Sequence, residues 1–316
     1  MTLVLSAPTG PYVTWTGEYR VARVVPRAAL HGLHAIDLED CSGRIEVLYR
    51  APTGGGTTSR PPQKRDVVRV TVTRAQAAHG GWYNRVEALE PIETYSTLQL
   101  LPHRLCPEPG LLYRLYCVMR SEIERPALWR FLDRVFAEPR RARAFVRRAA
   151  SRDCHHTEPG GLLRHSLELV EKLRLIIQDC DDLTRQCVLL GALLHDLGKV
   201  APDVLGRTPY WPREHALMNK PLLDGELCRL REEDLQAWQM LHFVFNVIDG
   251  SVDGSRVPEA RLIVELDRYS AGLDARRRAF EESPAWRQIG VLRPGAGGPA
   301  RIFYRPAPED ARLGEG

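Results

Sequence analysis

Apolar and polar residues alternate in five short segments near the beginning of the chain. The alternation places every second side chain on one face, which is typical of a β-strand with one buried face. A loop rich in Gly, Thr and Pro, residues 51–62, separates the third segment from the fourth. The segments are residues 19–25, 34–40, 44–49, 66–72 and 82–89. The first part of the chain is therefore predicted to be all-β.

The hydrophobic pattern then changes to the spacing of helices. Residues 96–110 contain three prolines and are interpreted as a linker. From residue 111 to residue 285, apolar residues recur every three or four positions, which predicts an all-α domain. Residues 286–316 are predicted to form a tail with a short strand pair that packs back on the helices.

The number and spacing of the strands indicate the type of β-domain. Five short strands within about 80 residues, with a long third connection, predict a small OB-like barrel over residues 1–95. A generic β-sandwich-like cap is the alternative. The predicted fold class is thus a two-domain protein, with an N-terminal all-β barrel and a C-terminal all-α bundle that ends in a strand pair.

Composition adds few constraints. A hydrophobic share of 44% supports real cores, and 27% charged residues is ordinary for a soluble protein. The net charge of +4 permits an anionic partner without requiring one. The seven cysteines are odd in number and form no Cys-x-x-Cys motif, which predicts reduced thiols. Because no apolar stretch approaches the length of a membrane span, we expect a cytoplasmic protein without a membrane partner.

An adjacent histidine and aspartate, His195 and Asp196, follow the apolar residues 188–194. That segment is apolar on all sides, so we expect a buried helix that delivers both side chains to the interior. His165 shares a predicted helix face with leucines and is expected to face the same interior. A single inward histidine is usually a hydrogen-bonded core residue, but a buried carboxylate needs a cation. A divalent cation satisfies all three groups and predicts metal-assisted hydrolysis of a phosphate ester.

Three more candidate ligands occur later in the chain. His215 lies at the start of a predicted helix, and His242 interrupts an apolar segment. Asp267 ends another apolar segment. Solvated surface histidines are unusual in such contexts, which favours interior positions for these side chains.

This arrangement resembles the H…HD…D pattern of HD-domain phosphohydrolases. His215 and His242 match two extra histidines found in HD subgroups that bind two metals. The resemblance implies one or two divalent ions, with Mn²⁺ as the leading candidate and Mg²⁺, Fe²⁺ or Co²⁺ as alternatives. With two metals, Asp196 is the natural bridge. The implied metal ligands are His165, His195, Asp196, His215, His242 and Asp267.

The barrel narrows the resemblance further. A barrel, a linker, a histidine-containing helix start and then Leu-His-Asp-Leu-Gly-Lys at residues 194–199 resemble the YhaM-type 3′-to-5′ exoribonucleases over nearly the whole chain. Residues 156–168 are separately similar to the HD relaxase domain of MobH-type conjugation proteins. Both families place a metal site on a nucleic-acid backbone.

The resemblance also implies roles beyond metal ligation. Asp196 would be catalytic, and Lys199 would neutralise charge on the scissile phosphate. His155 and His156 would contact the substrate or transfer a proton to the leaving oxygen, whereas a helix-cap role is the alternative for this pair. Three arginines are candidate phosphate contacts: Arg164, Arg207 and Arg213.

OB folds bind single strands by stacking bases on aromatic side chains beside a positive groove. The candidate aromatics are Tyr49, Trp82 and Tyr83, although such rings can instead pack the barrel. Arginines near them are Arg20, Arg23, Arg69 and Arg85.

We therefore predict a metal-dependent 3′-to-5′ exonuclease that acts on single-stranded RNA or DNA, and the family resemblance also makes a homo-oligomer an expectation. Three alternatives remain. The first is an HD phosphohydrolase acting on nucleotides, and the second is a MobH-like DNA-processing nuclease or relaxase. The third is a catalytically inactive single-strand binding protein.

Overall fold

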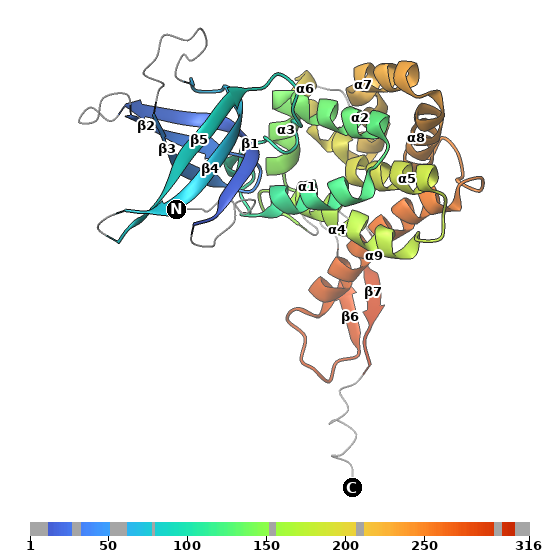
Figure 1. The fold of residues 1–316 in the computed structure, drawn as a ribbon. Helices are drawn as coiled ribbons and strands as arrows, with labels where there is room; N and C mark the ends of the chain where they lie inside the picture. The colour runs from blue at the N-terminus through green and yellow to red at the C-terminus, as the bar shows by residue number, and fades with distance from the viewer. Residues whose placement is uncertain are drawn as a thin grey trace. The chain divides into compact units, whose positions relative to one another are not determined.

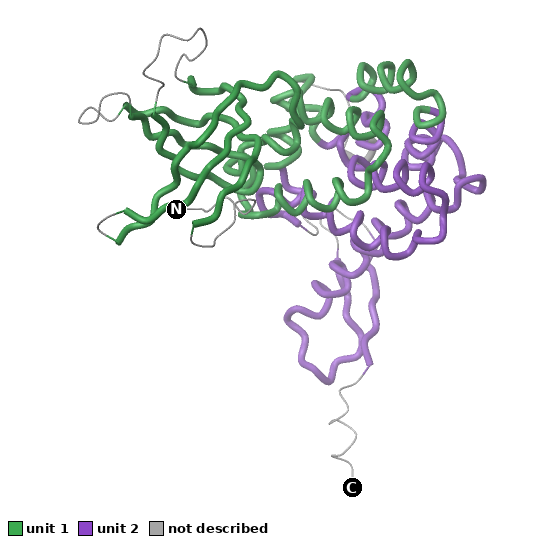
Figure 2. The backbone as a smooth tube through the Cα atoms, viewed as in Figure 1, with its two compact units in different colours: residues 1–147, 200–208, 223–238 green, residues 148–199, 209–222, 239–316 purple. Residues whose placement is uncertain are grey.

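The computed structural model describes most of the chain as two compact units. The described residues are 12–26, 33–50, 62–77, 80–151, 156–206, 212–293 and 299–306, without the side chains of residues 212–214. The first unit comprises residues 1–147, 200–208 and 223–238, and the second comprises residues 148–199, 209–222 and 239–316 (Figure 2). Most of the loop at residues 51–62 lies outside the described residues.

The first unit begins with a closed five-stranded barrel (Figure 1). Its strands follow the order β1-β2-β3-β5-β4, and β4 pairs with β1 to close the barrel. Only the pair β3 and β5 is parallel. The strands are β1 (Thr14–Pro26), β2 (Leu33–Glu39), β3 (Arg44–Arg50), β4 (Val67–Gln76) and β5 (Trp82–Pro91). The predicted OB-like barrel is confirmed.

Alternation of side chains explains how the barrel forms its core. Val68, Val70 and Val72 of β4 are buried inside, together with matching apolar residues of the other strands. The first half of β1 pairs with β4 and its second half pairs with β2, and its register against β2 shifts between Val21 and Arg23. Such a bulge bends a strand and increases its twist. The bend allows a single long strand to turn the corner at which the barrel closes.

The segment between the barrel and the first helix is held by hydrogen bonds at both ends. The backbone N–H of Cys41 donates to the carbonyl oxygen of Gln99 at 2.7 Å. The Ser96 hydroxyl and the Leu98 backbone N–H both donate to Asp133 Oδ1, at 2.9 and 3.0 Å. This connection therefore packs as part of the first unit.

A partly buried ion pair links α3 to α7 in the helical part of the first unit. Arg141 of α3 donates to the carbonyl oxygen of Val135 at 2.8 Å and pairs with Glu226 of α7 at 2.6 Å. The elements are η1 (His103–Leu105), α1 (Leu111–Glu122), α2 (Pro126–Ala137), α3 (Pro139–Arg147), α6 (Ala201–Leu205), and parts of α7 (Asn219–Glu233) and α8 (Leu235–Ile248).

The second unit is a helical core built on three mutually packed helices, α4 (Gly161–Ile176), α5 (Asp182–Leu194) and α9 (Pro258–Phe280). Gly191 of α5 lies so close to Val244 of α8 that a Cβ atom would overlap it. The missing side chain thus permits the close approach of α8. Two 3₁₀ segments complete the helical part, η2 (Leu197–Val200) and η3 (Pro212–Met218).

The chain's last described elements are β6 (Ile289–Leu292) and β7 (Arg301–Tyr304), which form an antiparallel pair on α9. The predicted terminal strand pair is confirmed. Among the described residues, none of the helices combines the length and the apolar character that crossing a membrane requires.

Candidate metal centre

The apolar helix α5 delivers the adjacent His195 and Asp196. Asp181 caps its first turn, because the carboxylate accepts the backbone N–H of Thr184 at 3.0 Å. Every residue from Gln186 to Leu194 is buried, as expected for a helix that is apolar on all sides. The helix ends at His195, so both polar side chains emerge inside the second unit, where both are buried.

The second histidine comes from α4. Gly160 precedes this helix with a φ of 89°, a conformation that favours glycine. A Cβ atom at Gly161 would overlap the backbone of His156, so the helix start needs glycine at this position too. Leu162, Leu169 and His165 are buried on this helix, which confirms the predicted inward orientation of His165.

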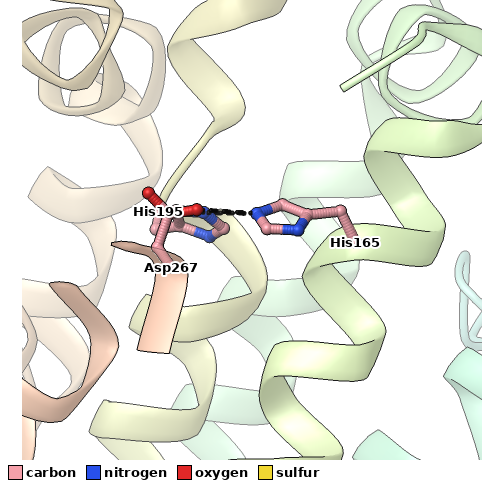
Figure 3. A group of neighbouring side chains, drawn as sticks. All are labelled: His165, His195 and Asp267. Carbon is pink, nitrogen blue, oxygen red and sulfur yellow. Dashed lines mark hydrogen bonds and ion pairs between the residues drawn. The ribbon is translucent and has the colours of Figure 1, made fainter. Parts of the chain in front are cut away.

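Asp267 of α9 completes a cluster with the two histidines (Figure 3). His165 Nε2 lies 3.0 Å from Asp267 Oδ1 and 3.3 Å from His195 Nε2. The distance from His195 Nε2 to Asp267 Oδ1 is 3.8 Å. Residues that are far apart in the sequence therefore bring three ligand atoms to one point.

The geometry of this cluster fits a divalent cation. Ligand atoms that each lie about 2.0–2.2 Å from one ion are separated by roughly 3–4 Å from one another, and the three distances fall in this range. His195 Nδ1 donates to the carbonyl oxygen of Ala192 at 2.8 Å, which leaves the Nε2 lone pair directed into the cluster. Asp267, with its side chain 40% exposed, leaves one side of the cluster open.

Burial and charge set the protonation of the cluster. Burial opposes ionisation of Asp267, but hydrogen bonds with the two histidines outweigh it and keep the pKa of this carboxyl below its usual range. Burial lowers the pKa of His165. Burial acts on His195 in the same direction, but the charges of Asp196 and Asp267 prevail and raise the pKa of His195. The cluster therefore offers an ionised carboxylate and a neutral imidazole for a cation.

Asp196 lies beside this cluster and is held by three further groups. Its Oδ2 accepts from Lys199 Nζ at 2.6 Å, and its Oδ1 is 2.7 Å from His215 Nε2. Its Oδ2 also lies 3.4 Å from His195 Nε2. Burial opposes ionisation, yet His195, His215 and Lys199 together hold the pKa of Asp196 well below its usual value. The structure thus brings together six of the sequence-predicted residues, namely His165, His195, Asp196, Lys199, His215 and Asp267.

Asn219 is a positioning residue that the sequence reasoning missed. Its amide donates to the carbonyl oxygen of His195 at 2.5 Å and accepts from the backbone N–H of Gly198 at 2.6 Å. The residue is only 1% exposed. Gly198 in turn lies against the backbone of His215, and a Cβ atom there would overlap the carbonyl oxygen. Asn219 and Gly198 together fix η3 against the turn that carries His195 and Asp196. The sequence signal that could have identified Asn219 is its position as a polar residue at the start of a helix, four residues after His215.

His242 belongs to a different group of side chains. Its Nδ1 lies 3.3 Å from Asn246 Nδ2 on the next turn of α8. Lys220 Nζ donates to Asn246 Oδ1 at 2.6 Å and pairs with the buried Asp249 at 2.7 Å. Burial and the nearby Lys220 lower the pKa of His242. This histidine is therefore kept neutral and oriented by Asn246, two conditions that an imidazole ligand requires.

His156 lies next to His165, with 5.7 Å between the ring centroids. Its ring faces two carboxylates, Glu168 at 3.4 Å and Glu158 at 3.6 Å. The hydrogen bond with Glu168 is the main cause of its raised pKa, although partial burial opposes the shift. A φ of 54° is unusual for a residue other than glycine, and it marks a constrained backbone at this point.

The remaining candidate contacts are described only in part. Arg164 extends from α4 with its Nε 3.5 Å from Glu158 Oε1. His155 and Arg207 lie outside the described residues, and so does the side chain of Arg213.

The candidate aromatics of the barrel have different environments. Tyr49 is buried in the barrel core, so it has the packing role and offers no exposed face to a base. Trp82 is 42% exposed, and Tyr83 beside it is half-buried. The Arg74 guanidinium lies 5.6 Å from the centre of the Trp82 ring, and Tyr12 contacts that ring edge-on. Trp82 and Arg74 thus form an exposed aromatic and cationic surface at the hairpin between β4 and β5.

Other barrel arginines are neutralised by carboxylates. Arg20 pairs with Glu39 at 3.0 Å, and Arg23 pairs with Asp37 at 2.6 Å. In the same way, Arg69 pairs with Glu18 and Glu90, and Arg85 pairs with Glu87. Carboxylates therefore neutralise all four of the arginines that were expected to form a positive groove beside the aromatics.

Comparison with known proteins finds a family match for the segment that contains the cluster. Residues 162–272 match the HD domain, and this segment includes His165, His195 and Asp267. No curated protein matches the chain. The match supports an HD-domain superfamily member and suggests a metal-dependent phosphohydrolase, and the cluster is a possible binding group for its divalent metal.

Proposed function

We propose that this protein is a metal-dependent 3′-to-5′ exonuclease that hydrolyses phosphodiester bonds of single-stranded RNA or DNA. The cluster of His165, His195 and Asp267 within the HD-domain match carries the hydrolytic part of the proposal. The closed OB-like barrel in the same chain, with the exposed Trp82 beside Arg74, supports nucleic acid as the substrate. The order of these parts, which resembles the YhaM-type exoribonucleases, favours the 3′ end.

His165, His195 and Asp267 would hold the first cation, with Mn²⁺ as our leading candidate. Imidazole and carboxylate ligands suit Mn²⁺, and Mg²⁺, Fe²⁺ and Co²⁺ are the alternatives. Asp196 and His215, whose Oδ1 and Nε2 atoms lie 2.7 Å apart, would contribute to a second site. The resemblance to two-metal HD subgroups adds His242 as a further ligand of that site. Such a cation supplies a Lewis acid that polarises a phosphoryl oxygen and makes water a nucleophile at neutral pH.

The side chains around the metal ligands have separate tasks in this proposal. Lys199 places an ammonium group next to Asp196, where negative charge develops on the scissile phosphate. His156, whose pKa is raised mainly by its hydrogen bond with Glu168, keeps its proton to a higher pH than a free imidazole does. That proton would go from the imidazole ring to the leaving 3′ oxygen of the shortened strand. Asn219 would keep His195 and Asp196 in place during turnover.

A time course on 5′-labelled single-stranded RNA and DNA of equal sequence tests the proposal. The reactions contain Mn²⁺, Mg²⁺ or EDTA. We expect a metal-dependent ladder that shortens from the 3′ end, and the faster of the two strands identifies the substrate. An endonucleolytic pattern on DNA would instead favour a MobH-like enzyme. Absence of cleavage with Mn²⁺ bound would overturn the nuclease proposal.

One observation favours a second candidate function, hydrolysis of free nucleotides by the same site. Five barrel arginines, including Arg44, pair with carboxylates, which reduces the positive charge that the described barrel surface offers to a strand. A nucleotide phosphohydrolase would not need the barrel for catalysis. Release of inorganic phosphate or nucleoside monophosphate from nucleoside triphosphates, with intact single strands, would identify this activity.

Replacing Trp82 by alanine is expected to weaken single-strand binding about 10-fold while leaving the rate at saturating strand nearly unchanged. Loss of one stacked base costs about 1–3 kcal/mol, and 1.4 kcal/mol corresponds to a factor of 10. The change is measured as Kd by fluorescence anisotropy and as KM against kcat in the cleavage assay. Tyr95→Ala is the matched control, because Tyr95 is also 42% exposed. Equal effects of the two substitutions would remove Trp82 from the binding surface.

A further inference from the structure

The β6–β7 hairpin exposes an unusual concentration of apolar side chains. Of the fifteen large hydrophobic residues that are exposed in the described part of the chain, five lie between residues 286 and 304. Their exposures range from 45% to 74%. They are Trp286, Ile289, Val291, Ile302 and Tyr304. Large exposed apolar patches on a protein mark interaction sites.

The strand register places four of these residues on one face. Ile289 is opposite Tyr304, and Val291 is opposite Ile302. Alternate residues of a strand point to opposite faces, so these two pairs form a single patch, which we call the outward face. All four side chains are between 45% and 74% exposed, so the described residues of the second unit leave the outward face uncovered.

The other face of the hairpin lies against α9. A Cβ atom at Gly290 would lie 2.8 Å from the carbonyl oxygen of Ala279 and 3.0 Å from the ring of Phe280. Phe303 is the cross-strand partner of Gly290 and shares this face. The hairpin is thus supported by a helix on one side, as a two-stranded sheet requires for stability.

Two arginines, Arg301 and Arg305, lie on the supported face, and the exposed Arg293 directly follows β6 outside the paired strands. Arg301 lies over the ring of Phe303, with 5.1 Å between the guanidinium carbon and the ring centre. Arg305 lies 4.4 Å over the ring of Phe280, and its guanidinium donates to the carbonyl oxygens of Ser283, Pro284 and Arg287. Within the two strands, the outward face therefore consists of apolar side chains alone.

We propose that a second copy of this chain covers the outward face, so that two hairpins pack face to face across a two-fold axis. An uncharged face is complementary to itself, since no like charges meet when two copies of it are brought together. A nucleic-acid strand would instead need cationic groups on the contact surface. The dimer goes beyond the proposed activity and does not depend on it.

The exposed area agrees with a weak dimer. The four side chains of the outward face, at about 150–250 Å² each and the observed exposures, provide roughly 350–600 Å² of surface on one copy. Two copies would together bury about 700–1,200 Å², which reaches the lower end of specific interfaces, about 1,200 Å², only at its upper limit. We therefore expect a reversible dimer that dissociates on dilution.

Sedimentation velocity of the full chain tests the proposal over protein concentrations from about 1 to 200 µM, which span a micromolar Kd. We expect the mass to rise from that of a monomer to that of a dimer. Ile302→Glu should raise the dimer Kd at least about 30-fold, because it buries an unpaired carboxylate in an apolar contact. A monomer at every concentration would overturn the proposal.

Leu175→Glu is the matched control, since Leu175 of α4 is also highly exposed, at 67%. This substitution should leave the dimer Kd within about twofold of that of the unmodified protein, because most surface substitutions have small effects. Ile302→Val should retain the dimer, because it keeps the face apolar. Thermal unfolding checks that both glutamate variants remain folded. Equal weakening by the two glutamate substitutions would place the contact elsewhere and would also contradict the proposal.

Discussion

Replacing Asp196 by asparagine is expected to lower the rate of hydrolysis by about 100- to 1,000-fold, the size of effect seen when a group acting on developing charge is removed. Both carboxylate oxygens are in use, one with Lys199 and one with His215. An amide keeps a single oxygen and carries no charge, so one of the two partners faces an N–H group. The single-turnover rate with saturating Mn²⁺ and the Mn²⁺ affinity from calorimetry are the measurements.

Two variants keep this expectation testable. Asp224→Asn changes an exposed carboxylate of α7 and should leave the rate within about twofold, as surface substitutions do. Asp267→Asn removes a candidate ligand whose side chain is 40% exposed, so its effect on folding is smaller than that of a fully buried group. A rate for the folded Asp196→Asn protein within about tenfold of the unmodified enzyme would exclude Asp196 from the chemistry.

Replacing Gly198 by alanine is expected to lower the free energy of unfolding by about 3 kcal/mol, the cost of overpacking a tightly packed site. The added methyl group would overlap the carbonyl oxygen of His215, and this neighbour is backbone that cannot rotate away. The 3₁₀ segment η3 must therefore move, and His215 moves with it away from Asp196. We expect a weaker Mn²⁺ affinity together with the lower stability, measured by denaturant unfolding and calorimetry.

Gly225→Ala provides the matched control within α7. A Cβ atom at Gly225 meets no atom within 4 Å. Alanine there should stabilise the helix by about 0.5–1 kcal/mol, because glycine is a poor helix former. If Gly198→Ala were as stable as the unmodified protein and bound Mn²⁺ equally well, the contact between Gly198 and His215 would have no role in holding the site.

The metal cluster shows how far local patterns determine the position of a functional residue. Burial of His165 and His195 follows from helix periodicity and from an apolar helix that ends at a polar pair. Asp267 lies partway along α9, a long helix that is less uniformly apolar than α5. The hydrophobic pattern around Asp267 therefore indicates only that its side chain faces the interior. The three ligand atoms meet because α4, α5 and α9 pack together, and sequence spacing does not encode that contact.

Asn219 and His242 illustrate the part that sequence patterns leave undetermined. The two hydrogen bonds of Asn219 reach residues 21 and 24 positions earlier in the chain, and no short motif joins such positions. His242 matches a predicted ligand only by its place in the order of histidines along the chain, whereas the structure describes contacts of its group with Asn246 and Lys220. Partners of this kind depend on how neighbouring elements pack, so they are seen only after folding.

The sequence by itself determined the classes of structure in this protein, namely a five-stranded barrel, a helical bundle and a terminal strand pair. Alternation and helical spacing are local properties, and they require only that each element bury one face. Tertiary structure alone decided that Tyr49 packs inside the barrel and that carboxylates neutralise Arg20, Arg23, Arg69 and Arg85. It also decided that the described residues leave one face of the last hairpin uncovered. Each of these outcomes depends on which helices and strands pack against one another. The free energy of burial comes from contacts between residues that are far apart in the sequence, so a local pattern does not determine it.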